Sequence, residues 1–505
     1  MLMRKLTEAE ENLLKKFVTN LYGPVYFIHS LPEFIIPPIN SKVSRKDTSW
    51  RLNILESLTS GDLDISDFLT TSDIPLDEAM QKAKAFHEKW VERFGHSSIA
   101  EQNLMHLCIE DTSRFLSGDI ELMNKRPSYI EWSQRYQRPN RDRFVIPPEL
   151  ENYPELKEKF IKVWNVSFDA YETLVSKLTD YLKLTVEKNK HESDKAYMGR
   201  ISKIAFEDAR YALLLSAKTS FAVALNALDL QDIVRKLQSH GTKEAEILAR
   251  NIIDEAEKIA PSMMRHLSPS KYQLTVNKEM EDLVNGYDLE NASVDSDVEL
   301  IDFTGKNGDM TFLDILTMHI IFSYTGKPLE RIKDLVMKLG MEEKAIIVKS
   351  ASSKMDQFDH LIEPFRSVRY KFQLRLSEAA WHQLLRHRMI NFNAYKPTIE
   401  NGYTVPPNIE KAGCTDVLKR AIDEAEKLYL ELHEKLPETS SYVVTNAHKR
   451  IVLMDTDLWA FDHYANLRCT PEAQWDIRNI SFKMLDLIKE STPEVAEFLA
   501  RRKQS

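Results

Sequence analysis

The chain carries GHSSIAEQNLMHLCIEDTS at residues 95–113, and a second segment, DHLIEPFRSVRYKFQLRLS at 359–377, aligns on it without a gap. The alignment places His96 over His360 and Ser113 over Ser377. Self-similarity within one chain is the sequence mark of a repeated structural unit. The sequence therefore predicts two diverged copies of one folding unit.

Further matches follow in the same order along both halves. RFVIPPEL (143–150) matches YTVPPNIE (403–410), and a long amphipathic segment follows each of them. EDARYALLL (207–215) matches HKRIVLM (448–454), which places Arg210 over Arg450, and KEAEILARNI (243–252) matches EAQWDIRNI (472–480), which places Arg250 over Arg478. Each match is weak alone, but their common order supports a tandem duplication.

Helical periodicity dominates the chain. Residues 156–184 and 243–267 repeat apolar residues at intervals of three and four with charges between them, which predicts amphipathic helices. Strand-like stretches are few and short: VELIDF (298–303), KAIIVKS (344–350) and the pre-proline segments RFVIPP and YTVPP. We expect an α+β, helix-rich protein of two tandem units, each a small antiparallel sheet wrapped by helices.

One stretch has the composition of a linker. Residues 285–297, NGYDLENASVDSD, are acidic and polar and lack periodicity. They predict a first repeat at 1–284 and a second repeat at 298–505.

The totals exclude several classes of protein. Cys108, Cys414 and Cys469 lie far apart without metal-ligand spacing, so no structural metal site or disulfide framework is expected. No stretch approaches the ~18 apolar residues of a membrane span, and the N-terminus lacks the apolar core of a signal peptide, which predicts a cytoplasmic protein. The formal net charge of −9 gives no reason to expect nucleic acid as a partner.

The segment SEAAWHQLLRHRMINFNAYKPT (377–398) carries the most distinctive chemistry. Its first part predicts a helix that ends near Arg386, so that the sequence Arg-His-Arg projects from the helix end. Arg386 and Arg388 can bind phosphate or carboxylate in bidentate fashion, and the ring of His387 can stack or donate between them. A solvated basic turn is the simpler interpretation of these three residues.

The corresponding first-half segment, 121–150, has lost this triplet but keeps another pattern. Glu131, Ser133 and Arg135 alternate at a spacing of two, so an extended segment would direct all three to one face. Ala394, Lys396 and Thr398 occupy these places in the second half. A ligand could meet an acceptor, a hydroxyl and a guanidinium there, although Ser133 could also simply cap a turn.

Together these segments resemble the flavin-dependent thymidylate synthases, whose signature reads RHRxxSxNExSxRY. The second half supplies the Arg-His-Arg triplet and Asn393, and the first supplies the ExSxRY part with Ser128 before it. In addition, GHSSIAEQ (95–102) is similar to the GHxSxxEH element of that family, and NLRCTPEAQWDIR (466–478) is similar to its LRxxxxAQxEIR helix. The resemblance covers about residues 35–270 and 298–500.

The resemblance implies a role for residues at the matching positions. The nucleotide dUMP would be bound by Gln383, Arg386, Glu131, Ser133, Arg135 and Arg210. FAD would be bound by Arg386, His387, Arg388, His96, Ser98, Glu101 and Asn226. Arg468 would lie against the uracil as the catalytic residue. No metal is implied.

Members of this family build each active site at a subunit interface, from strips of different protomers. In this chain one half tends to keep a residue where the other has lost it: His240 stands opposite Arg468 and Phe365 opposite Glu101, with Arg450 as an exception, retained opposite Arg210. A homo-oligomer must keep every residue in every subunit, whereas a fused pair needs each residue once per composite site. We expect half as many sites as there are repeats, with each site complete. We also expect a homodimer that mimics the tetramer of the family.

The resemblance further implies reductive methylation of dUMP to dTMP, with FAD as the cofactor and NADPH and methylenetetrahydrofolate as co-substrates. Two alternatives remain open from the sequence. The methyl acceptor could be another uracil-containing molecule such as RNA, or the protein could be a non-catalytic paralogue that binds nucleotide or flavin. Structural interpretations also remain, namely His96 as an interior histidine and Arg468 as a partner of Asp476 on its own helix.

Overall fold

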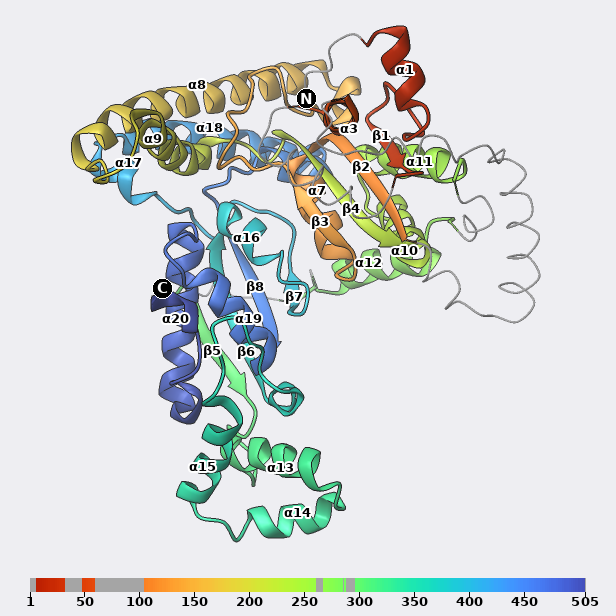
Figure 1. Cartoon of the computed structure of the whole chain (residues 1–505). Helices are drawn as coiled ribbons and strands as arrows, with labels where there is room; N and C mark the ends of the chain where they lie inside the picture. The colour runs from red at the N-terminus through yellow and green to blue at the C-terminus, as the bar shows by residue number, and fades with distance from the viewer. Residues whose placement is uncertain are drawn as a thin grey trace, which may run out of the picture. The chain divides into compact units, whose positions relative to one another are not determined.

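The computed structural model describes residues 6–31, 48–59, 104–259, 267–284, 286–287 and 296–504. The chain divides into two compact units. Unit 1 comprises Met1–Glu290 and Val405–Asn446, and unit 2 comprises Asn291–Thr404 and Ala447–Ser505. A segment of the second half therefore belongs to the unit that the first half forms, as the colours of Figure 1 show.

Unit 1 contains a four-stranded antiparallel sheet in the order β1-β2-β4-β3. Its strands are β1 (Val25–Ile28), β2 (Leu104–Ser113), β3 (Ser128–Glu131) and β4 (Lys218–Asn226). The helices α7 (Arg114–Met123), α10 (Ala227–Gln238) and α11 (Lys243–Ala256) share one hydrophobic core with the sheet, whereas α1 (Glu8–Leu14) and α3 (Trp50–Thr59) share the other.

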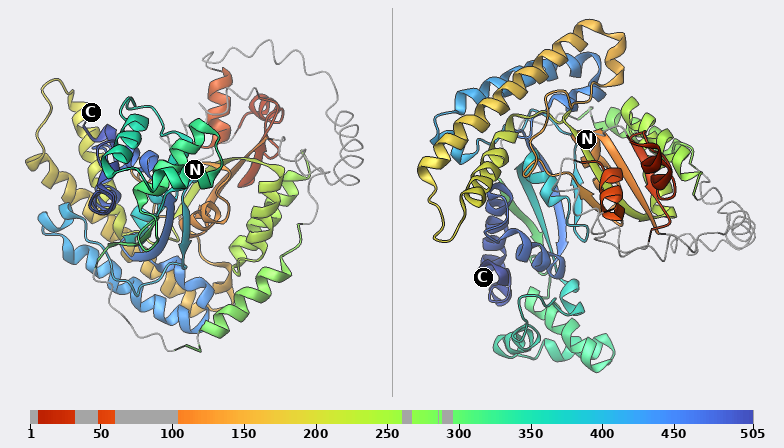
Figure 2. Two further views of the ribbon diagram at one scale, coloured as in Figure 1. Left: turned by 90° about the horizontal axis from the view of Figure 1, so that it is seen from below. Right: turned by 45° about the horizontal axis from the view of Figure 1, so that its top comes forward.

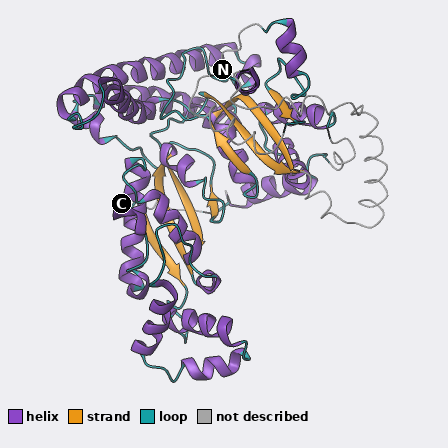
Figure 3. Cartoon of the chain, in the orientation of Figure 1, coloured by secondary structure: helices purple, strands orange, loops and turns teal. Residues whose placement is uncertain are grey.

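The two cores of unit 1 follow from the alternation of side chains along its strands. In β1, Val25 and Phe27 belong to the core beneath α10 and α11, and Tyr26 and Ile28 belong to the core beneath α1 and α3. Successive residues of a strand point to opposite faces, so apolar residues at every position require cover on both faces. Figure 3 shows the strands of this sheet between the two sets of helices.

Unit 2 contains a second four-stranded antiparallel sheet in the matching order β5-β6-β8-β7. Its strands are β5 (Val298–Phe303), β6 (Arg369–Ser377), β7 (Asn391–Ala394) and β8 (Lys449–Asp457). The helix α16 (Glu378–Leu384) follows β6, and the helices α19 (Leu458–Arg468) and α20 (Trp475–Ser491) follow β8. The helices α13 (Phe312–Thr325), α14 (Leu329–Val336) and α15 (Met341–Ser352) lie between β5 and β6 along the chain. Two sheets of identical strand order confirm the predicted duplication and the helix-rich α+β class.

Helices from both repeats pack together within unit 1. The first repeat provides α8 (Pro154–Thr185) and α9 (Asp194–Ala209), and the second provides α17 (Pro407–Lys411) and α18 (Thr415–Lys435). The two long helices α8 and α18 lie side by side, as Figure 2 also shows. The remaining helices are α12 (Lys271–Val284), η2 (Pro148–Asn152), η3 (Arg210–Ala212), η5 (Glu363–Ser367), η6 (Pro437–Val443), η7 (Pro493–Val495) and η8 (Arg501–Gln504).

A short symmetric contact joins the repeats inside unit 1. Leu214 and Thr445 form an antiparallel bridge. The N–H of Leu215 donates to the carbonyl of Val444 at 2.8 Å, and the N–H of Asn446 donates to the carbonyl of Leu213 at 2.9 Å. With Leu214 equivalent to Thr445, these two bonds are the same bond made once by each repeat. This is the pattern of an isologous dimer interface, retained within a single chain.

The strand expected at KAIIVKS (344–350) is wrong, because these residues lie within α15. Glu343 accepts the backbone N–H of Gly340 at the helix start, and Lys344 and Val348, four residues apart, are both buried. A spacing of four favours a helix once both residues face a core. The pre-proline segments form single bridges, Phe144 with Ala217 and Tyr403 with His448, rather than strands.

Several classes of site are absent from the part of the chain that the structure describes. No helix there is long and apolar enough to cross a membrane. The described residues also contain no cluster of three or more histidine, cysteine or acidic side chains that could hold a metal ion. The three cysteines are buried thiols.

Equivalent serines cap α7 and α16 and predict equivalent losses of stability. Ser113 accepts the N–H of Leu116 and donates to Glu244, with an Oγ to Oε2 distance of 2.8 Å. Ser377 accepts the N–H of Ala380 and donates to Asp476 at 2.5 Å. Replacing either serine with alanine is expected to lower the free energy of unfolding by roughly 2 kcal/mol, because a cap and a buried donor to a carboxylate are lost together.

Urea unfolding of the two alanine variants measures this loss. Ser193 provides the control, since it caps α9 through the N–H of Ala196 at an exposed position. Its replacement with alanine is expected to lower stability by roughly 0.5–1 kcal/mol. Equal losses at Ser113, Ser377 and Ser193 would show that the carboxylate partners contribute nothing.

Candidate functional site

In unit 2 the Arg-His-Arg triplet follows α16 directly. The helix ends at Leu384, close to the predicted end at Arg386. Arg386 is half-buried, His387 is buried and Arg388 is exposed. The ring of His387 packs edge-on against Tyr464 of α19, with ring centroids 4.8 Å apart. The three residues therefore leave the helix in three different environments.

Arg468, at the C-terminal end of α19, contacts two of the other predicted residues. Its Nε donates to Nε2 of His387 at 2.9 Å, and its Nη2 donates to the backbone carbonyl of Gln383 at 2.9 Å. An imidazole nitrogen accepts a hydrogen bond only when it carries no proton. The structure thus brings Arg468, His387 and Gln383 together and holds His387 as a neutral ring in this contact. Asp476, the alternative partner of Arg468, lies on the next helix, α20.

The side chain of Gln383 is buried and incompletely hydrogen-bonded. Its Nε2 donates to Oε1 of Gln474 at 3.0 Å and to the carbonyl of Ala379 at 3.1 Å. Its Oε1 has no hydrogen-bond partner among the described residues. Gln474 itself caps α20, so the amide of Gln383 is held in one orientation. A buried carbonyl oxygen of this kind can accept an N–H from a ligand.

In unit 1 the strand β3 ends at Glu131, and residues 133–136 form a turn. The expectation of an extended segment through Arg135 is therefore wrong. The last ladder bond runs from the N–H of Trp132 to the carbonyl of Ser220, and the N–H of Tyr136 then donates to the carbonyl of Ser133. Oγ of Ser133 accepts the N–H of Arg135 at 3.3 Å. Ser133 acts as a turn cap in this structure.

Glu131 lies at the centre of a buried network. Its Oε2 pairs with Nη1 of Arg114 at 2.6 Å. Its Oε1 accepts from the hydroxyl groups of Ser117 at 2.9 Å and Thr219 at 3.0 Å. The carboxylate is 3% exposed, and both of its oxygens have partners within the protein. Glu131 is therefore fixed in position by side chains of α7 and β4.

Arg114 is a member of this network that the sequence analysis missed. It is the first residue of α7, where the positive end of the helix dipole disfavours a cation. Glu378 occupies the same position in α16 of the second repeat, directly after the capping serine. The sequence signal that could have identified Arg114 was a reversal of charge at one aligned position, with arginine in the first repeat and glutamate in the second. The Nε of Arg114 has no hydrogen-bond partner among the described residues.

Arg135 and Arg210 lie beside this network. Nε of Arg135 pairs with Oε2 of Glu207 at 2.5 Å. Arg210 is 3% exposed, and its Nε donates to the carbonyl of Glu207 at 3.3 Å. Its Nη2 has no hydrogen-bond partner among the described residues. Burial, together with the nearby cations Arg135 and Arg114, lowers the pKa of Arg210 to about 10, against the opposing effects of Tyr211 and Glu207.

Other predicted residues have different outcomes. Asn226 caps α10, where its side chain accepts the N–H of Asp229 at 2.9 Å. His96, Ser98 and Glu101 lie outside the described residues.

The sheet registers correct the alignment of the two repeats. Lys218 pairs with Ser113, and Lys449 pairs with Ser377, so these lysines are equivalent. Counting from them places Arg210 over Ser441 and Arg450 over Thr219, nine residues away from the alignment expected from the sequence. Arg450 therefore does not stand opposite Arg210, and it is no exception to the pattern in which one repeat keeps a residue that the other has lost. Arg450 instead forms a buried pair with Glu378, with Nε 2.8 Å from Oε1.

The sheet registers also test the predicted alignment of Glu131 with Ala394. Glu131 pairs with Phe221, and Ala394 pairs with Val452, which is the equivalent residue of β8. Glu131 and Ala394 are therefore equivalent residues, as the sequence predicts. The helix caps correct a second match: Thr242 and Gln474 are equivalent caps, so Glu246, not Arg250, lies over Arg478.

Lys125 occupies the place of Arg388 in the first repeat, three residues before β3. Burial lowers the pKa of Lys125 to about 7, against the opposing effect of Glu121. The unfolded chain therefore binds a proton between pH 10.5 and pH 7 that the folded chain does not, and stability falls as the pH falls through this range. Lys125→Met is expected to stabilise the protein at pH 7 by on the order of 2 kcal/mol and to flatten the alkaline pH dependence.

Thermal unfolding between pH 7 and pH 10 measures this effect. Lys177→Met, at an exposed position of α8, is the control and should leave the pH dependence unchanged. A pH dependence of Lys125→Met equal to that of the unmodified protein would show that the amine is charged in the folded state at pH 7.

Comparisons with known proteins identify relatives of both halves of the chain. A family model described as "Thymidylate synthase complementing protein" matches residues 59–262 and 323–494, one match in each half. A protein named "UPF0159 protein" from Chlamydia muridarum is 22% identical over 98% of this chain and 94% of its own length. A "UPF0159 protein" from Thermoplasma acidophilum is 23% identical over 82% of this chain and 88% of its own length.

A shorter relative matches only part of the chain. The "Flavin-dependent thymidylate synthase" of Clostridium tetani is 27% identical over 38% of this chain and 76% of its own length. The two-part match of the family model corresponds to the two sheets of equal strand order. The chain belongs to the thymidylate synthase complementing protein family, in a tandem-duplicated form.

Proposed function

We propose that this protein is a flavin-dependent thymidylate synthase that converts dUMP to dTMP with methylenetetrahydrofolate and NAD(P)H. The observation that carries the proposal is the guanidinium of Arg210, a buried cation without a carboxylate partner. Arg114 pairs with Glu131 and Arg135 pairs with Glu207, so Arg210 has no ion pair of its own among the described residues, and the charge of Glu207 offsets its charge only in part. A buried unpaired charge is costly, and a bound anion removes that cost.

The phosphate of dUMP is the anion that suits this position. A phosphate monoester accepts charge-assisted hydrogen bonds from several donors, and guanidinium groups match its geometry. Arg210 would bond it through Nη2, with Arg135 beside it. Glu131 would face the sugar from its fixed position, and Ser133 would contribute a hydroxyl.

Residues of the second repeat suit the pyrimidine. The negative charge that develops on the uracil ring during attack would be stabilised by Arg468, whose guanidinium is already oriented by His387 and Gln383. The unpartnered Oε1 of Gln383 could accept the N3–H of the uracil. Arg386 would reach the nucleotide from the same turn.

The donors of the second repeat also fit an anionic cofactor. Arg388 is exposed and Arg386 half-buried, so both can meet the pyrophosphate of FAD. His387, His96, Ser98, Glu101 and Asn226 complete the proposed flavin contacts. These residues would hold the flavin, which would supply, after reduction by NADPH, the hydride that completes the methyl group.

The proposal assigns one complete site to each chain. Arg210 stands over Ser441 and Glu131 over Ala394, while the triplet of the second repeat stands over Met123, Asn124 and Lys125. Neither repeat alone retains both sets of residues. We propose that both sets serve one nucleotide and that the protein forms a homodimer.

Two assays test the proposal. The purified protein is expected to be yellow and to release tritium from dUMP labelled at C5 when NADPH and methylenetetrahydrofolate are present. Yellow protein without tritium release from dUMP, but with release from uracil-labelled RNA, would favour the RNA acceptor. Yellow protein without release from either substrate would favour a non-catalytic paralogue, and colourless protein that releases no tritium after addition of FAD would contradict the proposal.

A further inference from the structure

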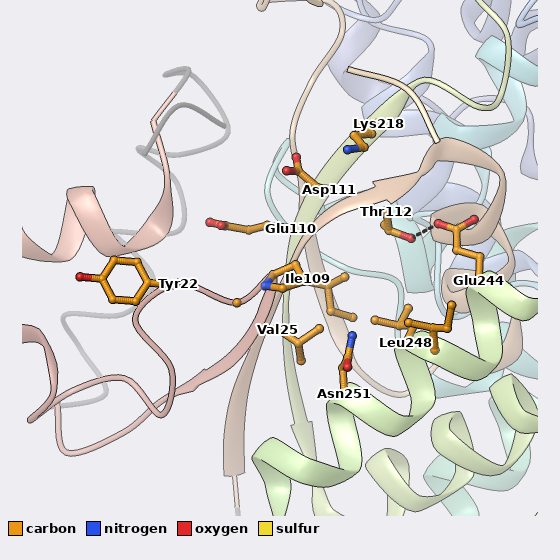
Figure 4. Close-up of a pocket in the computed structure, with 13 residues that line it drawn as sticks. Tyr22, Val25, Ile109, Glu110, Asp111, Thr112, Lys218, Glu244, Leu248 and Asn251 are labelled. Carbon is orange, nitrogen blue, oxygen red and sulfur yellow. Dashed lines mark hydrogen bonds between the residues drawn. The ribbon is translucent and has the colours of Figure 1, made fainter. Parts of the chain in front are cut away.

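Unit 1 contains a cavity of about 470 Å³ on the side of the sheet that α11 covers (Figure 4). The loop before β1, the end of β2, the start of β4 and α11 line it. Its apolar wall includes Val25, Ile109 and Leu248. The volume falls within the range of pockets that bind small molecules.

The acidic side chains of the cavity are already engaged by the protein. Glu244 accepts from the hydroxyl groups of Thr112, drawn in Figure 4, and Tyr442. Asp111 pairs with Arg143. Glu110 pairs with Arg51 at 3.3 Å and accepts from the hydroxyl of Tyr26 at 3.1 Å. None of the three carboxylates therefore needs a ligand.

Two other polar side chains of the cavity have no such partners. The ammonium group of Lys218, at the start of β4, makes no ion pair within 4.0 Å with any described residue. The amide of Asn251, on α11, likewise makes no side-chain hydrogen bond within the described chain. Figure 4 shows both side chains at the cavity, with Ile109 and Leu248 between them in this view. A cation and an amide thus remain available to a ligand.

The equivalent place in the second repeat holds a carboxylate. Oδ1 of Asp297 accepts from Nζ of Lys449 at 2.9 Å and from Nε of Arg375 at 3.0 Å, and Oδ2 lies 3.8 Å from Nζ of Lys483. Asp297 directly precedes β5, so the chain itself supplies an anion at this position of unit 2.

Matching backbone contacts establish the equivalence. The N–H of Glu110 donates to the carbonyl of Pro24, and the N–H of Arg375 donates to the carbonyl of Asp297, which places Pro24 over Asp297. Lys218 lies over Lys449 by the sheet register, and Asn251 over Lys483 by the caps of α11 and α20. The first repeat thus keeps the principal cation, replaces the internal carboxylate with proline and carries Glu110, which pairs with Arg51, in place of Arg375.

A β-bulge accompanies this replacement. Between Ile109 and Thr112 the register of β2 shifts, whereas β6 pairs with β8 without interruption. The additional residue, Asp111, adopts a φ of 64°. Bulges redirect side chains at sheet ends, and here Asp111 meets Arg143. Asp111 thus has Arg143 as its ion-pair partner, and Lys218 acts on it only through a longer-range charge interaction.

We propose that this cavity binds the carboxylate of a small organic acid, with Lys218 as the ion-pair partner and Asn251 as a second polar contact. The ligand takes the place that the side chain of Asp297 fills in the second repeat, and its apolar body lies on Val25, Ile109 and Leu248. None of the residues that line the cavity belongs to the proposed nucleotide site, and the inference does not depend on the proposed function.

Titration of the full-length protein with benzoate, followed by saturation-transfer NMR, tests the inference. Benzoate is expected to bind, whereas benzamide, of the same shape but uncharged, is expected to bind at least tenfold more weakly. Lys218→Gln is expected to weaken benzoate binding at least tenfold. Lys449→Gln, the same change at the equivalent position of the second repeat, is the matched control and should leave benzoate binding unchanged.

A second variant keeps the test independent of any loss of folding. Pro24→Asp combined with Asn251→Lys recreates the internal carboxylate and the lysine equivalent to Lys483, and is expected to abolish benzoate binding while thermal stability is kept. The inference is overturned if benzoate and benzamide bind equally, if neither binds, or if Lys218→Gln leaves the affinity for benzoate unchanged.

Discussion

Arg210→Met is expected to weaken dUMP binding about 100-fold without destabilising the ligand-free protein. The charge-assisted hydrogen bonds of one guanidinium to phosphate correspond to roughly 3 kcal/mol, which is a factor of about 100 in affinity. In the ligand-free protein the same guanidinium is buried without a carboxylate partner, and burial lowers its pKa to about 10. Methionine removes that unfavourable charge and still fills much of the volume.

Calorimetric titration with dUMP and urea unfolding measure the two effects. Arg138→Met is the control, because Arg138 forms an exposed ion pair with Glu172, and both properties are expected to stay unchanged. A large loss of stability in Arg210→Met with unchanged dUMP affinity would identify Arg210 as a structural residue.

Arg114→Met is expected to lower the free energy of unfolding by about 3–5 kcal/mol, the largest loss of stability among the variants considered. The carboxylate of Glu131 would remain buried beside the hydroxyl groups of Ser117 and Thr219 but without its ion pair to Arg114. Arg114 also holds Glu131 in place through its bond of 2.6 Å. Under the proposed function the affinity for dUMP falls as well, because Glu131 loses its orientation.

A double variant separates loss of the pair from loss of packing. Arg114→Met with Glu131→Gln removes both charges and is expected to recover more than half of the lost stability, as measured by urea unfolding. The equivalent double variant in the second repeat, Arg450→Met with Glu378→Gln, should show the same recovery. Additive losses in both double variants would mean that the carboxylates contribute independently of their arginine partners.

The sequence predicted the duplicated architecture because the similarity between the two repeats extends over long segments. Two aligned segments of 19 residues identified equivalent strands β2 and β6, and the serines at their ends, Ser113 and Ser377, are equivalent caps in the structure. The bulge at Asp111 places Ile109 over Leu374, one residue away from the gap-free alignment. The end of α16 near Arg386 followed from local signals alone. These features depend on periodicity and capping, which are properties of neighbouring residues.

Features that depend on tertiary contacts could not be predicted. The segment KAIIVKS became part of a helix because the ammonium of Lys344 is buried against Asp314 at 2.6 Å, a contact between residues 30 positions apart. Arg210 was aligned on the wrong arginine because its true counterpart, Ser441, shares no chemistry with it. The network of Glu131 was also hidden, since its partner Arg114 reaches it from another element.

The contact between the two repeats depends on backbone groups and therefore permits their side chains to diverge. The bonds between Leu215 and Val444 and between Asn446 and Leu213 use backbone groups only, so they persist whatever side chains the two repeats carry. Side chains elsewhere were therefore able to diverge. The reversal from Arg114 with Glu131 to Glu378 with Arg450 keeps a buried ion pair in each repeat while moving its cation to another element.

The number of dUMP molecules bound by each chain tests the central claim most directly. Equilibrium dialysis with labelled dUMP and the FAD-loaded protein is expected to give one molecule per chain at saturation, and at a dUMP concentration near the Kd of the unmodified protein binding should be lost in Arg210→Met of the first repeat and equally in Arg386→Ala of the second. Two molecules per chain, or binding that survives either substitution, would contradict a single site to which both repeats contribute.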